Sequence, residues 1–216
     1  MDGNVITMRL NNTGVFVDIV DGKKRQSKFL TLQNFQSCIS REFCLDTGLL
    51  PVGTIAFKLH QDRKRLAMIR SAGIKSVKYE LSDEGHDIIK DYIVPIPALL
   101  WIFEMNLRNI ILDTRVFAVK TELITPNIHV FNVPLSNVYD DGRVCWGDKD
   151  FLREPLRSLV GLASLPDVFF SRAFNRDLDV RRNGLFALDF FQQYDKKEIF
   201  PAEILQEWKT FKEVWQ

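Results

Sequence analysis

With 216 residues, 46% of them apolar, the chain can bury a substantial core, and we expect one compact unit. Lys and Arg number 29 against 28 Asp and Glu, and a net charge of +1 creates no field that would attract nucleic acid or an anionic membrane. The start MDGNVITMRL has no basic segment followed by an apolar one, and prolines interrupt the apolar run YIVPIPALLWIF. We therefore predict a cytoplasmic protein that contacts neither nucleic acid nor membrane.

Residues 1–50 predict a small extension made of strands and then a helix. NVITMRL and GVFVDIV alternate apolar and polar residues around NNTG, which is a hairpin signal, and SKFLTL offers a third strand. Next, apolar residues recur at steps of three and four: Leu32, Phe35, Ile39 and Phe43. This spacing predicts an amphipathic helix that ends near Gly48. Cys38 and Cys44 accompany the apolar stripe and are interpreted as small core residues.

Residues 51–216 form the predicted main domain, which opens with an antiparallel meander. GTIAFKL, RLAMIR and KSVKYEL read as strands joined by polar hairpins, and ALLWIFE and IILDTRVFAVK read as two more. NIHVF, introduced by Pro126, is the last predicted strand. His60 and the basic residues from 63 to 65 fall in one hairpin turn, which we interpret as a solvated loop and not as a phosphate site.

The last third of the chain has helical patterns, so the predicted fold class is α+β. REPLRSLVGLASLPDVFFSRAF predicts one or two short helices interrupted at Pro166, and GLFALDFFQQYDKK predicts another. After Pro201, aromatic and aliphatic residues recur at steps of four, three and four: Ile204, Trp208, Phe211 and Trp215. This stripe predicts a C-terminal helix packed on the sheet.

Cys145 follows directly on the stretch VPLSNVYDDGRV, between the meander and the helices. Together with Cys38 and Cys44 it makes an odd number of cysteines without metal-ligand spacing, so we predict neither a metal site nor a cofactor. His129 lies sixteen residues upstream, and a Cys–His hydrolase remains open if the chain folds back. By residue type alone, an ordinary buried cysteine is the simpler interpretation.

The stretch PLSNVYDDGRVCWGD resembles the active-site segment of ubiquitin-conjugating (UBC) enzymes, in which an asparagine precedes the cysteine by eight positions, as Asn137 precedes Cys145. The chain is more similar still to prokaryotic UBC-like family D, which includes PRTRC system protein B. The similarity lies in NVYDDGRVCWG, VPIPALLWIF, RVFAVK and FFSRAF, over roughly residues 50 to 200. Two departures stand out: Pro134-Leu135-Ser136 replaces the eukaryotic His-Pro, and Asn175-Arg176 replaces the usual Thr-His of the family.

The resemblance implies a UBC-like fold: a meander, then the cysteine segment, then helices. It implies that Cys145 accepts the C-terminus of a ubiquitin-like protein from a ThiF-type activating enzyme and passes it to an amine on an unidentified acceptor. A thiolate suits such a carrier because its thioester is open to aminolysis. Asn137 is the candidate to stabilise the oxyanion, to hold the turn, or to do both.

Further residues near Cys145 are candidates for positioning the substrates. Tyr139 and Trp146 could wall the groove that receives an extended C-terminal tail. Asp140 and Asp141 either make the turn together with the following glycine or orient the incoming amine, and Asp148 could do the latter instead. The alternative function is a non-catalytic UBC-like scaffold that binds a ubiquitin-like protein.

Overall fold

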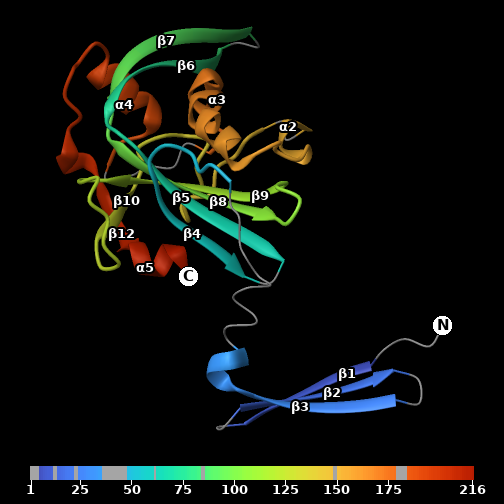
Figure 1. Ribbon diagram of the computed structural model, residues 1–216. Coiled ribbons are helices and arrows are strands. Elements are labelled where there is room, and N and C mark those ends of the chain that lie inside the picture. Colours follow the sequence, from blue (N-terminus) through green and yellow to red (C-terminus); the bar gives the residue numbers. More distant parts are fainter. Residues whose placement is uncertain are drawn as a thin grey trace. The chain divides into compact units, whose positions relative to one another are not determined.

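The computed structural model describes residues 5–11, 14–21, 24–35, 48–60, 62–83, 86–147, 150–178 and 184–216 (Figure 1). The chain divides into two units, Met1–Thr47 and Gly48–Gln216, and each is described by itself. In the described part, no helix is both long enough and apolar enough to span a bilayer.

The first unit contains a three-stranded antiparallel sheet in the order β1-β2-β3. Its strands are β1 (Val5–Asn11), β2 (Gly14–Asp21) and β3 (Lys24–Thr31), so the predicted hairpin and third strand are confirmed. Residues 32–35 are helical. The remainder of the predicted helix, with Cys38 and Cys44, lies outside the described residues.

The second unit is built on a six-stranded sheet in the order β12-β10-β9-β8-β5-β4, antiparallel throughout. Its strands are β4 (Thr54–His60), β5 (Arg63–Arg70), β8 (Ala98–Asn106), β9 (Ile111–Val119), β10 (His129–Asn132) and β12 (Gln206–Thr210). The register places Met68 opposite Trp101 and Trp101 opposite Val116. The predicted meander is therefore confirmed in its central strands.

A long hairpin leaves this sheet between β5 and β8. It consists of β6 (Gly73–Asp83) and β7 (His86–Ile96), and the short β11 (Ala173–Phe174) pairs with β6 in parallel. No strand was predicted for β7, because DIIKDYIV does not alternate cleanly and SDEGHD reads as a loop. The structure instead carries the β6–β7 strand pairing up to the pair of Asp83 and His86.

The helices of the second unit are short. They are α2 (Asp150–Arg153), the 3-10 helix η1 (Leu159–Ser164), α3 (Leu165–Ser171), α4 (Ala187–Tyr194), the 3-10 helix η2 (Ala202–Ile204) and α5 (Phe211–Trp215). Pro166 lies in the first turn of α3, where its missing N–H leaves no bond unmade, so it begins a helix and does not interrupt one. The structure is thus mixed α+β, mostly antiparallel, with few helices.

The main sheet buries both of its faces. Trp101 and Phe103 face the larger apolar cluster, which also contains residues of β6, β7, α3 and α4. Leu100 and Ile102, on the alternate face, join Val214 of α5 in a smaller cluster. Figure 1 shows the β6–β7 hairpin with α3 and α4 on one side of the sheet and α5 on the other.

The predicted C-terminal helix is wrong over most of its length. Residues 206–210 form β12, which pairs with β10 and places Lys209 opposite Val130. The helical spacing of apolar residues indicates only a weak local preference. Backbone hydrogen bonds to the unpaired edge of β10 outweigh that preference here. The helix begins only at Phe211, where Thr210 and Glu213 form a capping box with Glu213 N–H bonded to Thr210 Oγ1.

Replacing Phe191 with Ala tests the larger cluster. Phe191 is fully buried, with ring centroids 6.0 Å from Tyr79 and 5.4 Å from Phe174. The cavity should lower the free energy of unfolding by about 3–5 kcal/mol, measured by urea titration. Ile199→Ala is the matched control, because Ile199 is 83% exposed and its loss should change stability by no more than about 0.5 kcal/mol. Equal effects would contradict this account of the core.

Candidate active site

The segment from Asn137 to Cys145 folds back on itself as a small hairpin. Cys145 N–H donates to the Asn137 carbonyl at 2.8 Å, and Tyr139 N–H donates to the Arg143 carbonyl at 2.8 Å. An isolated antiparallel bridge joins Val138 and Val144 between these two bonds. The stretch between the meander and the helices thus contains local strand pairing.

This segment (residues 137–145), which we name the cysteine hairpin, is docked on the edge of β9. Val116 N–H donates to the Gly142 carbonyl and Val144 N–H to the Thr114 carbonyl, both at 2.8 Å. β10 pairs with β9 further along, at Ala118. The hairpin therefore extends the sheet beside β10, and backbone bonds fix its position instead of side chains alone.

A tight turn from Tyr139 to Gly142 closes the hairpin. Gly142 N–H donates to the Tyr139 carbonyl at 2.9 Å, and Gly142 has φ +83°. A Cβ there would lie 2.5 Å from the Phe117 ring, so both the backbone angle and the space demand glycine. The Asp141 carboxylate accepts bonds from Arg143 N–H at 3.2 Å and Nε at 2.7 Å, and it raises the pKa of Arg143. In this structure Asp141 holds the turn.

Asn137 ties the hairpin to the other sheet. Its Nδ2 donates to the carbonyl of Ala173, the first residue of β11, at 3.0 Å. Its backbone is left-handed, with φ +62°, a conformation that asparagine tolerates far better than most residues. Half-buried, Asn137 thus satisfies a backbone constraint and a tertiary hydrogen bond at once.

The Cys145 thiol is half-buried and unbridged, and it lies in a groove of about 340 Å³, which we name the Cys145 groove. The groove is lined by Asn137, Cys145, Trp146, Gly147, Arg172, Ala173, Asn175, Asp177 and Leu178. Arg172 Nη1 donates to the Trp146 carbonyl at 2.5 Å, a second bond between the cysteine segment and the residues that follow α3. The groove therefore lies between two segments that are joined by hydrogen bonds.

Three polar residues of the groove were not predicted: Arg172, Asn175 and Asp177. Asn175 Nδ2 donates to Asp177 Oδ2 at 3.0 Å, and Asp177 N–H donates to Asn175 Oδ1 at 3.1 Å, so the amide fixes the carboxylate. The only sequence signal was the departure from Thr-His at positions 175 and 176. Arg176 lines a different hollow, together with Phe186 and Asp189.

The predicted substrate-positioning residues lie in different places. Buried Trp146 lines the Cys145 groove and also a hollow of about 410 Å³ on which Tyr139 lies. Tyr139 is absent from the residues that line the Cys145 groove, and its ring centroid lies 5.2 Å from the Arg143 guanidinium carbon. Asp140 is an exposed residue of the turn. Asp148 lies outside the described residues.

His129 lies on β10 and does not line the Cys145 groove. Its Nδ1 is 2.8 Å from Glu207 Oε1, and both side chains are about half exposed. Over the residues that the structure describes, no cluster of three or more His, Cys, Asp or Glu could hold a metal ion.

The fold and the groove define an α+β protein that presents a thiol beside an asparagine amide. The family model of Prokaryotic E2 family D matches residues 35–208, and the chain belongs to this family. The suspected family is thereby confirmed, and membership gives the chain a ubiquitin-conjugating-like role in general terms. Comparisons with curated proteins and with solved structures gave no match.

Substitutions at Asn137 separate its two structural roles. Asn137→Gly removes the bond to Ala173 but adopts φ +62° freely, so it should cost about 1 kcal/mol in the free energy of unfolding. Asn137→Ala loses the same bond and also strains the backbone, which should cost about 1–2 kcal/mol more. Urea unfolding of both variants measures the difference. If the Ala variant were at least as stable as the Gly variant, the left-handed backbone would not matter.

Proposed function

We propose that Cys145 carries the C-terminus of a ubiquitin-like protein as a thioester and transfers it to an amine. A ThiF-type activating enzyme would supply the activated C-terminus. The proposal takes the fold to be UBC-like, with the meander, the cysteine hairpin and the following helices in that family's order. A reduced thiol of this kind suits the cytoplasm.

The observation that carries this proposal is the position of the thiol. Cys145 is neither fully buried nor bridged, and it faces an open groove that also holds an asparagine amide, an arginine and a carboxylate. A structural cysteine is usually buried among apolar side chains. A groove of about 340 Å³ has room for a few small residues of an extended tail, and the C-terminal end of that tail would reach the thiol.

The transfer consists of two acyl substitutions. The Cys145 thiolate attacks the activated C-terminal carbonyl, the C–S bond forms, and the leaving group of the activating enzyme departs with the bonding electron pair. An amine then attacks the thioester carbonyl, the C–S bond breaks, and the thiolate is regenerated while the amine gives up a proton. Splitting the reaction in this way replaces one difficult step by two easier ones.

Asn137 is suited to stabilise the oxyanion of each step. An asparagine amide has two N–H donors, and the bond to Ala173 uses one of them. That bond also holds the side chain still, and the Cys145 N–H bond to the Asn137 carbonyl keeps the two residues adjacent. A preorganised donor beside a developing oxyanion contributes a few kcal/mol to catalysis.

Asp177 is the better candidate for orienting the amine than the aspartates of the turn. It lines the groove together with Cys145, and Asn175 holds its carboxylate in place. Asp141 is instead engaged by Arg143, outside the residues that line the groove. A carboxylate at this position can orient the attacking amine and accept the proton that the nitrogen loses as the C–N bond forms.

The alternative, a non-catalytic scaffold, is favoured by the fact that Asn137 already has a structural task. In that case the groove would bind the tail of a ubiquitin-like protein without acylation, and Cys145 would be an ordinary groove residue. The two functions differ in whether a covalent adduct forms.

Intact mass spectrometry distinguishes carrier from scaffold. With ATP, the activating enzyme and the ubiquitin-like protein, the chain should gain an adduct that a thiol reductant removes. Cys145→Ala should abolish the adduct, whereas Cys38→Ala, Cys44→Ala and His129→Ala should retain it. A partner that still binds without any adduct would establish the scaffold, and loss of activity in His129→Ala would instead indicate a hydrolase.

Asp177→Asn separates loading from transfer. The amide keeps the shape of the side chain but loses its charge, so thioester formation should be unchanged while single-turnover transfer to free lysine slows about 10–100-fold. Glu122→Gln, at an exposed carboxylate that does not line the groove, is the matched control and should leave transfer nearly unchanged. An equal slowing by both variants would mean that Asp177 has no special part in transfer.

A further inference from the structure

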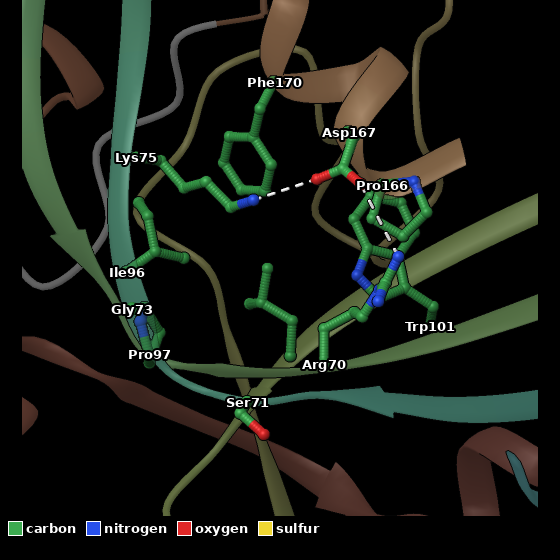
Figure 2. Close-up of a pocket in the computed structure, with 11 residues that line it drawn as sticks. Arg70, Ser71, Gly73, Lys75, Ile96, Pro97, Trp101, Pro166, Asp167 and Phe170 are labelled. Atoms are coloured by element: carbon green, nitrogen blue, oxygen red, sulfur yellow. Dashed lines mark hydrogen bonds and ion pairs between the residues drawn. The ribbon is translucent and has the colours of Figure 1, made fainter. Parts of the chain in front are cut away.

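A pocket separate from the Cys145 groove opens where β5 passes into β6 and where β7 passes into β8, against α3 (Figure 2). We name it the Lys75 pocket; its volume is about 270 Å³. It is lined by Arg70, Ser71, Gly73, Lys75, Ile96, Pro97, Leu99, Trp101, Pro166, Asp167 and Phe170. None of these residues lines the Cys145 groove, so the reaction proposed above leaves this pocket without a use.

Two cations of the pocket share a single carboxylate. Lys75 Nζ lies 2.9 Å from Asp167 Oδ1, and Arg70 Nη2 lies 3.6 Å from Asp167 Oδ2, as the dashed lines of Figure 2 show. The lining residues therefore have a net charge of +1. The Asp167 side chain is 63% exposed, against 37% for Arg70 and 40% for Lys75. A ligand carboxylate that lies inside the pocket would be less exposed to water than the Asp167 carboxylate is. Its attraction to Arg70 and Lys75 would therefore be stronger.

The walls around these cations are apolar. Ile96, Pro97 and Leu99 come from the β7–β8 corner, and the Phe170 ring centroid lies 5.6 Å from Lys75 Nζ. Trp101 is fully buried, and its indole N–H has no hydrogen-bond acceptor among the described residues. The indole nitrogen is inaccessible, so Trp101 contributes an apolar face to the wall and no donor to a ligand.

We propose that the Lys75 pocket binds a small organic carboxylate with an apolar body of about phenyl size. The carboxylate would take the place of Asp167 between Arg70 and Lys75, and the body would pack on Phe170 and Leu99. The volume lies just below the range of about 300–1,000 Å³ typical of drug-sized ligands, which suits a molecule of about this size.

Phenylacetate is the probe, titrated into the full chain by isothermal calorimetry at low salt. It should bind with a dissociation constant on the order of 1 mM, because about ten heavy atoms supply little more than that. 2-Phenylethanol, which has the same body without the charge, should show no saturable binding. Binding should weaken as salt is raised, since the cations are partly exposed.

Two substitutions with opposite expected effects on phenylacetate affinity complete the test. Lys75→Met keeps the apolar stem and removes the charge, so it should weaken phenylacetate binding at least about fivefold. Asp167→Asn removes the competing carboxylate and should tighten binding, while Lys78→Met, on β6 outside the pocket, should change nothing. The proposal is overturned if the folded wild type shows no saturable binding, if 2-phenylethanol binds equally well, or if Asp167→Asn weakens the complex.

Discussion

The docking of the cysteine hairpin on β9 is the constraint on which the rest of the Cys145 groove depends. Two backbone hydrogen bonds, from Val116 to Gly142 and from Val144 to Thr114, fix the hairpin on the strand, and each is 2.8 Å long. They form only because Gly142 adopts φ +83° and leaves room for the Phe117 ring. With the turn fixed in this way, Cys145 N–H meets the Asn137 carbonyl across the hairpin, and the eight-residue spacing of the two residues becomes direct contact.

The groove itself requires a second attachment. Asn137 bonds to Ala173, and Arg172 bonds to the carbonyl of Trp146, so the cysteine segment is joined to the residues that follow α3. Beneath these bonds lies an aromatic cluster in which Phe169 of α3 contacts Trp146 and Trp101, with centroid distances of 6.1 and 5.5 Å. Buried aromatic packing of this kind is dense, so it supports the backbone on both sides of the Cys145 groove.

Sequence patterns predicted the elements whose signal is local. The three N-terminal strands, the central meander and α4 follow from alternation and helical spacing, and all three are present. Predictions failed where a distant partner decides the outcome: residues 206–210 became a strand because β10 offers its edge, and β7 formed because β6 lies beside it. Cys145 and Asn137 could be singled out from their spacing. Arg172 and Asp177 had no pattern to mark them, and Asn175 was marked only by its departure from the Thr-His of the family.

The sequence by itself determined the α+β class and the family and singled out Cys145, because composition, strand alternation and a contiguous motif can be read without a partner. Only the tertiary structure decided that the turn docks on β9, that Asp141 is engaged by Arg143, and that Asp177 shares a groove with Cys145 from thirty-two positions away. The physical reason is that hydrogen bonds and packing between distant segments form only when the chain brings those segments together. Local residue preferences do not specify which distant segments meet.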